Sequence, residues 1–289
     1  MQTNQKWKVC CDTDILTDVM LGSPEDYYWL ATSSVAKDSI KKGFIFDIDE
    51  TKRQHESLQK LFENENVKVH LVPPRKDLPD IVFTRDTTTM TPWGLLGLKM
   101  REPSRQPEVS YVLEFAKTLG VNILGRINKG NIEGGDICIA RDDLLIVGCS
   151  GGRTSKEGVN ELSRIFNPKG FEIYTYEFES FFLHLDTIFS LVSNNCALVC
   201  VDVIEEIFIN FIQSIGLKII PVSYKEMRKL GANILSLGNN KVISATHNKR
   251  INQAIRNEGI KVIEADITQF TLGGGGIHCL TMPLARTLA

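Results

Sequence analysis

Short apolar segments and amphipathic segments recur along this chain in a fixed order. Each recurrence has two apolar stretches of strand length joined by a turn, then a segment with apolar residues at helical spacing, then a third apolar stretch. In the clearest copy, which begins at Gly135, the helical segment carries Val159, Leu162 and Phe166. Its predicted elements are strands at 136–140 and 144–149, a helix at 155–166 and a strand at 171–178. The order predicts a ββαβ unit.

Further copies extend the pattern over the rest of the chain. Three begin at Ile81, Leu185 and Ala232, and a degenerate N-terminal copy ends in a helix at 50–66 and a strand at 67–73. Because a unit of about 50 residues cannot cover its own apolar faces, we expect the units to close into a ring in which the termini meet in the first and last units. A doubly wound sheet also alternates strands and helices, but paired strands before each helix fit it poorly. No linker divides the sequence, which predicts one domain over residues 1–289.

The composition excludes several classes of function. Lys and Arg number 33 against 35 Asp and Glu, a net charge of -2, so no basic excess is available to neutralise nucleic acid. No stretch approaches the ~18 apolar residues that a membrane helix needs, and the N-terminus lacks the pattern of an export signal. We therefore expect a cytoplasmic protein that binds neither nucleic acid nor membrane. The oligomeric state, a homo-oligomer included, stays open.

The chain has seven cysteines, and this odd number favours reduced thiols over a disulfide framework. Cys196 and Cys200 flank an apolar run without a histidine at ligand spacing, so a zinc site is not expected. Cys279 has different surroundings, because it follows His278 and four consecutive glycines. A glycine run lets the backbone approach a ligand closely. We expect a reactive thiol here, the plainer alternative being a flexible turn before a buried cysteine.

Polar clusters mark the starts of the predicted units, at residues 83–86, 133–136, 184–186 and 273–279. In a ring of repeats these clusters would converge on one axis and could form a single site. His184 and Asp186 would face the same way on a strand, which suits an acid/base histidine with a carboxylate nearby. Buried carboxylates at Glu133 and Asp86 would need a partner, and a guanidinium offers donors in matching geometry. Singly, each could be a core histidine, a turn cap or a structural salt bridge; together they favour chemistry on a cationic amidine.

These four segments, in this order, resemble the guanidino-group-modifying enzymes, or penteins. That family includes arginine deiminase, dimethylarginine dimethylaminohydrolase, glycine amidinotransferase and agmatine deiminase. The resemblance covers nearly the whole chain and implies a five-bladed α/β propeller of ββαβ repeats with pseudo-fivefold symmetry. It also implies catalysis without a metal or an organic cofactor, on a small guanidino or ureido amino acid.

Carried over residue by residue, the resemblance makes Cys279 the nucleophile, His184 the general acid/base and Glu133 the carboxylate that orients His184. It makes Asp86 and Asp186 the residues that bind the guanidinium group.

Two arginines are implied as ligands of the substrate's α-carboxylate. Arg153 matches an arginine that follows the glutamate-containing hairpin of the family. Arg105 matches the other, although the nearby Arg101 could be confused with it. The plainer interpretation of both is an arginine on the protein surface.

The resemblance implies hydrolysis of a C–N bond at the guanidino or ureido carbon through a covalent thiouronium-type intermediate, of the arginine deiminase or dimethylargininase type. The chain is too short for the helical insertion of arginine deiminases, and its Ile-His-Cys loop resembles agmatine deiminases and amidinotransferases. A citrulline ureidohydrolase and an amidinotransferase therefore stay open as alternatives. A non-catalytic pentein binding module is disfavoured, because it has no need for Cys279, His184 and Glu133 together.

Overall fold

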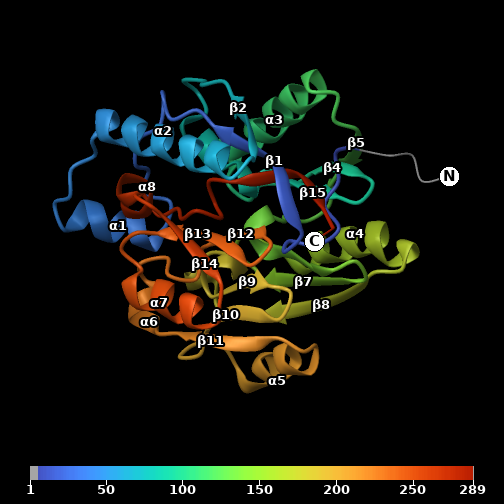
Figure 1. The fold of residues 1–289 in the computed structure, drawn as a ribbon. Coiled ribbons are helices and arrows are strands. Elements are labelled where there is room, and N and C mark those ends of the chain that lie inside the picture. The colour runs from blue at the N-terminus through green and yellow to red at the C-terminus, as the bar shows by residue number, and fades with distance from the viewer. Residues whose placement is uncertain (1–5, 289) are drawn as a thin grey trace.

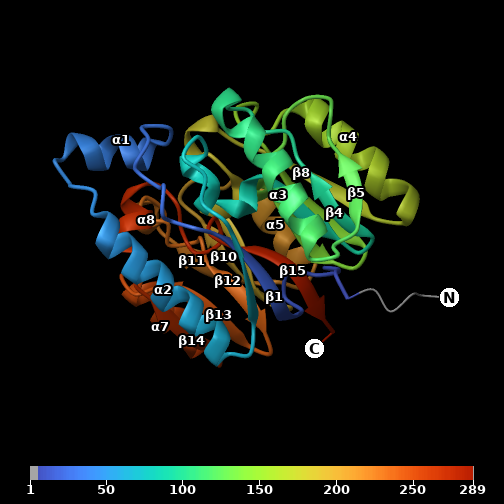
Figure 2. The same cartoon turned by 90° about the horizontal axis from the view of Figure 1, so that it is seen from above.

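Five three-stranded sheets form the core of the computed structural model, which describes residues 6–288. The sheets lie around a common centre, and the helices pack on the outside (Figures 1 and 2). This arrangement confirms the five-bladed α/β propeller that the repeats and the resemblance predicted. The strands are β1 (Ile15–Gly22), β2 (Lys68–Val72), β3 (Thr88–Thr91), β4 (Gly94–Gly97), β5 (Ile123–Arg126), β6 (Ile137–Arg141), β7 (Leu144–Cys149), β8 (Glu172–Glu177), β9 (Phe189–Ser193), β10 (Cys196–Cys200), β11 (Lys218–Val222), β12 (Leu235–Gly238), β13 (Lys241–Ala245), β14 (Lys261–Ala265) and β15 (Met282–Thr287).

Each of four sheets is an antiparallel hairpin to which a third strand is added in parallel. In the clearest repeat, β6 pairs with β7 antiparallel and β7 pairs with β8 parallel. A parallel neighbour requires a crossover, which a helix supplies in every unit. The helices are α1 (Ser34–Lys41), α2 (Ile48–Asn64), α3 (Gln106–Thr118), α4 (Lys156–Phe166), α5 (Glu206–Ser214), α6 (Tyr224–Met227), α7 (Lys249–Asn257) and α8 (Thr268–Leu272).

The remaining sheet closes the ring. Its order is β15-β1-β2, with β1 antiparallel to β15 and parallel to β2. The last strand of the chain thus takes the place of the first strand of the N-terminal unit. The two terminal segments meet, as predicted, and they do so within one shared sheet.

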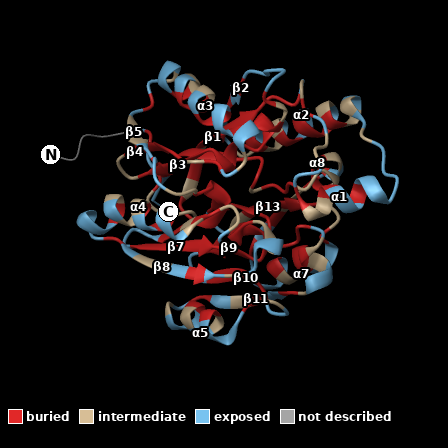
Figure 3. Cartoon of the chain, turned by 180° about the vertical axis from the view of Figure 1, so that it is seen from behind, coloured by how far each residue is buried: buried red, intermediate tan, exposed pale blue. Residues whose placement is uncertain are grey.

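The hydrophobic pattern explains the packing of these elements. In α4, the predicted residues Val159, Leu162 and Phe166 are buried, and the side chain of Ser155 caps the helix by accepting the N–H of Gly158 at 3.2 Å. The central strands of the sheets are buried on both faces, whereas the outer sides of the helices are exposed (Figure 3). Within residues 6–288, no helix has the length and apolar character needed to cross a membrane.

The beginnings of the units differ from the prediction. Residues expected to start strands form short 3-10 turns instead, at Thr84–Asp86, Gly134–Asp136 and Leu185–Thr187. The strands begin only after these turns, because polar side chains in the turns bond across the ring instead of along a ladder.

Candidate active site

The 3-10 turn at Gly134–Asp136 contacts both of the others, at Thr84–Asp86 and at Leu185–Thr187. Glycine allows this close approach. A Cβ atom on Gly135 would lie 2.7 Å from Nδ1 of His184, and a Cβ atom on Gly134 would clash with the carbonyl oxygen of Arg85. The glycines beside Glu133 therefore let polar side chains from separate blades meet.

His184 and Glu133 form a buried pair. Nε2 of His184 lies 2.8 Å from Oε2 of Glu133, and Oε1 of Glu133 accepts the backbone N–H of Arg101 at 2.9 Å. Burial opposes the charge on Glu133, but the hydrogen bond and charge of His184 lower the pKa of Glu133 to about 2. Burial also opposes an imidazolium, but the carboxylates of Asp86 and Glu133 raise the pKa of His184 to about 10. At neutral pH the pair is a carboxylate and an imidazolium.

Asp86 approaches the other side of the His184 ring. Its Oδ1 lies 3.8 Å from Nδ1 of His184, and neither atom has a hydrogen-bond partner among the described residues. Both atoms are therefore available to a ligand. Asp86, Glu133 and His184 also bring one ligand atom each within 4.8 Å of one another, a set that could hold a metal ion if His184 lost its proton.

Cys279 lies a few residues after α8 and beside Asp186, which belongs to one of the three turns. Its Sγ is 3.7 Å from Oδ2 of Asp186 and 3.2 Å from Nδ2 of Asn233. Burial, together with the charges of Asp186 and Asp86, raises the pKa of the Cys279 thiol well above its usual value. A thiolate at this position therefore needs a nearby positive charge or hydrogen-bond donors in order to form.

The glycine run before Cys279 is required by its neighbours. Gly274 has φ +99°, a conformation that other residues rarely adopt. A Cβ atom on Gly275 would clash with the ring of Phe83, and one on Gly276 would clash with Oδ1 of Asn233. The run is a tightly packed segment, not the flexible turn considered as the alternative.

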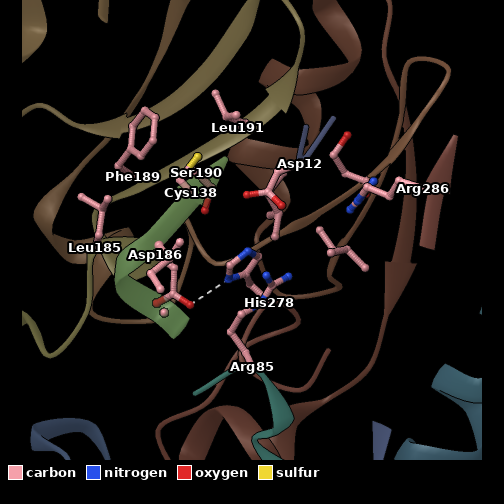
Figure 4. Close-up of a pocket in the computed structure, with 15 residues that line it drawn as sticks. Asp12, Arg85, Cys138, Leu185, Asp186, Phe189, Ser190, Leu191, His278 and Arg286 are labelled. Atoms are coloured by element: carbon pink, nitrogen blue, oxygen red, sulfur yellow. Dashed lines mark hydrogen bonds and ion pairs between the residues drawn. The ribbon is translucent and has the colours of Figure 1, made fainter. Parts of the chain in front are cut away.

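Asp186 is held by His278. Nδ1 of His278 lies 2.8 Å from Oδ2 of Asp186, while Oδ1 of Asp186 has no hydrogen-bond partner within residues 6–288 (Figure 4). The expectation that His184 and Asp186 share one face of a strand is wrong. Asp186 belongs to a 3-10 turn and turns toward Cys279 and His278, whereas His184 turns toward Glu133.

Arg105 differs from the carboxylate ligand expected from the sequence. It is buried, its Nη1 donates to Oδ2 of Asp86 at 2.7 Å, and its Nε and Nη2 donate to Glu108 at 2.9–3.1 Å. Nη2 also approaches the carbonyl oxygens of Asp80 and Phe83. With its donors engaged in this way, Arg105 fixes the orientation of Asp86.

Arg153 is held more loosely. Its Nη1 lies 3.4 Å from Oε2 of Glu133, and its Nη2 lies 3.9 Å from Oε1 of Glu102 and 3.5 Å from the carbonyl oxygen of Thr32. These are long contacts for a guanidinium group. Arg153 therefore keeps donors available beside the His184–Glu133 pair.

Sequence reasoning missed two residues. Asn233 contacts Cys279 and lies at the start of the repeat that begins at Ala232. Asp86 and Asp186 hold the same place in their own repeats, so an alignment of the repeats could have identified Asn233. Asp80 is buried and receives no hydrogen bond on its carboxylate within the described part of the chain. Burial raises the pKa of Asp80 against the opposing charges of Arg105 and Arg153, which places Asp80 in the same charged cluster.

A cavity of about 20 Å³ adjoins Asp186 and His278 (Figure 4). Arg85 and Arg286 line it, and Nε and Nη2 of Arg85 and Nε of Arg286 have no protein partner within residues 6–288. The volume is enough for about one water molecule, and polar groups of both kinds surround it. Two buried guanidinium groups therefore line a cavity that also adjoins Asp186 and His278.

Residues 31–286 match the family model described as N,N dimethylarginine dimethylhydrolase, eukaryotic. The protein YkgA of Bacillus subtilis is 34% identical over 233 residues, which cover 81% of this chain and 79% of YkgA. An arginine deiminase of Listeria monocytogenes is 28% identical over 255 residues and 72% of this chain, but the match spans only 62% of the deiminase.

Solved structures share the fold. A dimethylarginine dimethylaminohydrolase of Pseudomonas aeruginosa in complex with citrulline superposes with a TM-score of 0.78 at 23% identity, covering 93% of this chain and 99% of the other. The N-terminal domain of ArgZ, a cyanobacterial arginine dihydrolase bound to substrate, gives a TM-score of 0.81 at 20% identity, covering 93% and 98%.

Proposed function

The chain belongs to the N,N-dimethylarginine dimethylhydrolase family of the pentein superfamily, and from that premise we propose that it is a cysteine-dependent hydrolase of a free arginine-like amino acid. It cleaves a C–N bond at the guanidino carbon through a thiouronium-type intermediate on Cys279. One observation carries the proposal. Asp86 and Asp186 each keep one buried carboxylate oxygen without a hydrogen-bond partner among the described residues, and Nδ1 of the His184 imidazolium likewise has none. Oδ2 of Asp186 lies 3.7 Å from Sγ of Cys279, and Oδ1 of Asp86 lies 3.8 Å from Nδ1 of His184.

The free oxygens suit a guanidinium cation. Oδ1 of Asp86 and Oδ1 of Asp186 can each accept an N–H, while Arg105 and His278 hold the opposite oxygens in place. The same two carboxylates raise the pKa of the Cys279 thiol. A bound cation offsets their charge and so favours the thiolate when substrate is present.

The chemical steps follow from these protonation states. The Cys279 thiolate attacks the guanidino carbon, and the imidazolium of His184 gives its Nδ1 proton to the departing nitrogen as the C–N bond breaks. Neutral His184 then takes a proton from a water molecule, whose oxygen attacks the same carbon. The C–S bond breaks, and the thiolate and the imidazolium are restored. Glu133 stabilises the imidazolium throughout.

The other end of the substrate faces two opposite charges. Arg153 has donors available for an α-carboxylate, and the unbonded carboxylate of Asp80 can accept an α-ammonium group. This pairing favours a free amino acid over agmatine, which lacks the carboxylate. The names of the relatives support arginine and its methylated forms as the substrates to test.

The test is release of ammonia, methylamines, citrulline and ornithine from arginine, methylarginines, agmatine and citrulline. We expect a guanidinium substrate to be preferred over citrulline, because a ureido oxygen would face carboxylate oxygens without a proton between them. Asp86→Asn should erode that preference. If the wild type hydrolyses citrulline and ignores arginine, the protein is a ureidohydrolase; if it hydrolyses none of these compounds, the proposal is wrong.

A further inference from the structure

We propose that Asn233 is a further catalytic residue, whose side-chain amide donates a hydrogen bond to the Cys279 thiolate and fixes the loop that presents it. The inference rests on the proposed role of Cys279 as nucleophile. Asn233 is 1% exposed and lies between α6 and β12, at the start of the fourth repeat.

All four hydrogen-bonding positions of the Asn233 amide are used. Nδ2 donates to Sγ of Cys279 at 3.2 Å and to the carbonyl oxygen of Asp186 at 3.2 Å. Oδ1 accepts the backbone N–H of His278 at 2.9 Å and that of Cys279 at 3.3 Å. A side-chain amide has two N–H donors and one oxygen with two lone pairs, so the match is complete.

The partners also fix which way the amide faces. Two backbone N–H groups can meet only an acceptor, so Oδ1 must point toward the loop. A rotated amide would set its NH₂ group against both N–H groups and its oxygen against the carbonyl of Asp186. Nδ2 therefore faces Cys279, and because it can only donate, the sulfur must accept. A thiolate accepts a hydrogen bond far better than a thiol does.

A corresponding residue in another repeat shows why an amide stands here. Asp136 occupies the corresponding place in its own unit, where Oδ1 accepts the backbone N–H of Leu185 at 2.7 Å and braces the next turn. Asn233 braces the next turn in the same way, through the N–H of His278. An aspartate at 233 could accept the same backbone groups, but it would place an anion against the thiolate. The amide keeps the brace and supplies a donor.

The surroundings of the Asn233 amide suit both of its proposed roles, holding the loop and donating to the sulfur. A Cβ atom at position 276 would clash with Oδ1 of Asn233, so Gly276 allows the loop to lie directly on the amide. Nδ2 joins Cys279 to the backbone carbonyl of Asp186, the residue whose carboxylate oxygen Oδ2 lies 3.7 Å from the sulfur. The amide thus sets the sulfur between its own donor and the carboxylate that is proposed to bind the guanidinium.

The test is the pH dependence of Cys279 alkylation by iodoacetamide, with the modified peptide followed by mass spectrometry so that the other thiols do not interfere. Asn233→Asp keeps the size of the side chain and the backbone contacts but replaces the donor by an anion. We expect its alkylation profile to shift to higher pH by roughly one unit or more, and kcat/KM to fall by roughly 100-fold, as for loss of a donor to a catalytic anion. Asn233→Ser, which is neutral and smaller, should shift the profile less and keeps the test open if the aspartate variant fails to fold.

Asn252→Asp is the matched control. Asn252 lies on α7, is buried, and donates to the carbonyl oxygen of Ala245 instead of contacting Cys279. This variant should lower the unfolding temperature without moving the alkylation profile. An unchanged profile in Asn233→Asp, or equal shifts in both aspartate variants, would overturn the role of Asn233. Alkylation needs no substrate, so these results are independent of whether any guanidino compound is hydrolysed.

Discussion

Replacing Arg153 by alanine should separate substrates that carry an α-carboxylate from those that do not. The side chain of Arg153 is 11% exposed, and its contacts to Glu133, Glu102 and Thr32 are 3.4–3.9 Å long. Losing these weak contacts should have little effect on agmatine. For arginine, the variant removes one partner of a mostly buried charge pair, which costs roughly 2 to 5 kcal/mol. This corresponds to a loss of roughly 30-fold to several thousandfold in kcat/KM.

The assay compares kcat/KM for arginine and agmatine in three variants, Arg153→Ala, Arg101→Ala and Arg105→Ala. Arg101→Ala is the control, because Arg101 is exposed and only its backbone N–H, which alanine retains, bonds Glu133. Arg105→Ala should impair both substrates alike, since Arg105 holds Asp86 at the guanidinium end. Equal losses on both substrates in Arg153→Ala would remove Arg153 from the carboxylate site. A loss specific to arginine in Arg105→Ala would restore the role that the family resemblance implied.

Three further results are expected. Cys279→Ser should keep the fold but retain less than about 1% of the activity, because the hydroxyl is a far weaker nucleophile; greater activity in the purified variant would exclude Cys279 as the nucleophile. Cys149→Ala should cost roughly 1 to 2 kcal/mol of unfolding free energy and leave turnover unchanged, since this buried thiol packs in the core and donates to the carbonyl oxygen of Thr154; an inactive but folded variant would contradict this. The pKa of His184 is raised to about 10, so the imidazolium stabilises the fold fully below pH ~6.5. This stabilisation is lost as the pH rises toward 10. The pKa of Glu133 is lowered to about 2, so its carboxylate stabilises the fold fully above pH ~4.5. This stabilisation is lost as the pH falls toward 2. The free energy of unfolding in urea should therefore receive the greatest contribution from this pair between pH ~4.5 and pH ~6.5. Glu133→Gln should flatten the dependence of that free energy on pH. If its dependence on pH equals that of the wild type, the pair is not ionised.

The repeats predicted most of the fold because burial is periodic. Val159, Leu162 and Phe166 were assigned to the inner face of a helix from spacing alone, and they are buried in α4. Two kinds of feature were not predicted from the sequence. The 3-10 turns at the unit starts depend on side chains that bond across the ring, which no local pattern records. The small helices α1, α6 and α8 lack a long apolar period that would identify them.

The candidate site was predicted unevenly for a related reason. Residue type and position indicated Cys279, His184 and the carboxylates. The structure places Asp86 and Glu133 beside His184, and Asp186 beside Cys279. The partner of each side chain depended on blades distant in sequence. Arg105 pairs with Asp86 instead of standing free, and His278 pairs with Asp186. Spacing along the chain carries no information about such pairings.

The unit starts show how a symmetric scaffold produces an asymmetric site. Asp86, Asp136, Asp186 and Asn233 hold corresponding places in successive repeats, yet each has a different environment. Asp136 is engaged on both oxygens by Thr154 and Leu185, so it braces the ring and has no capacity left for a ligand. Asp86 and Asp186 each keep one oxygen free, and Asn233 turns a donor toward sulfur. The fold places a polar group at the start of each of these four repeats. The neighbours that saturate this group or leave it free decide whether it supports the fold or can act on a substrate.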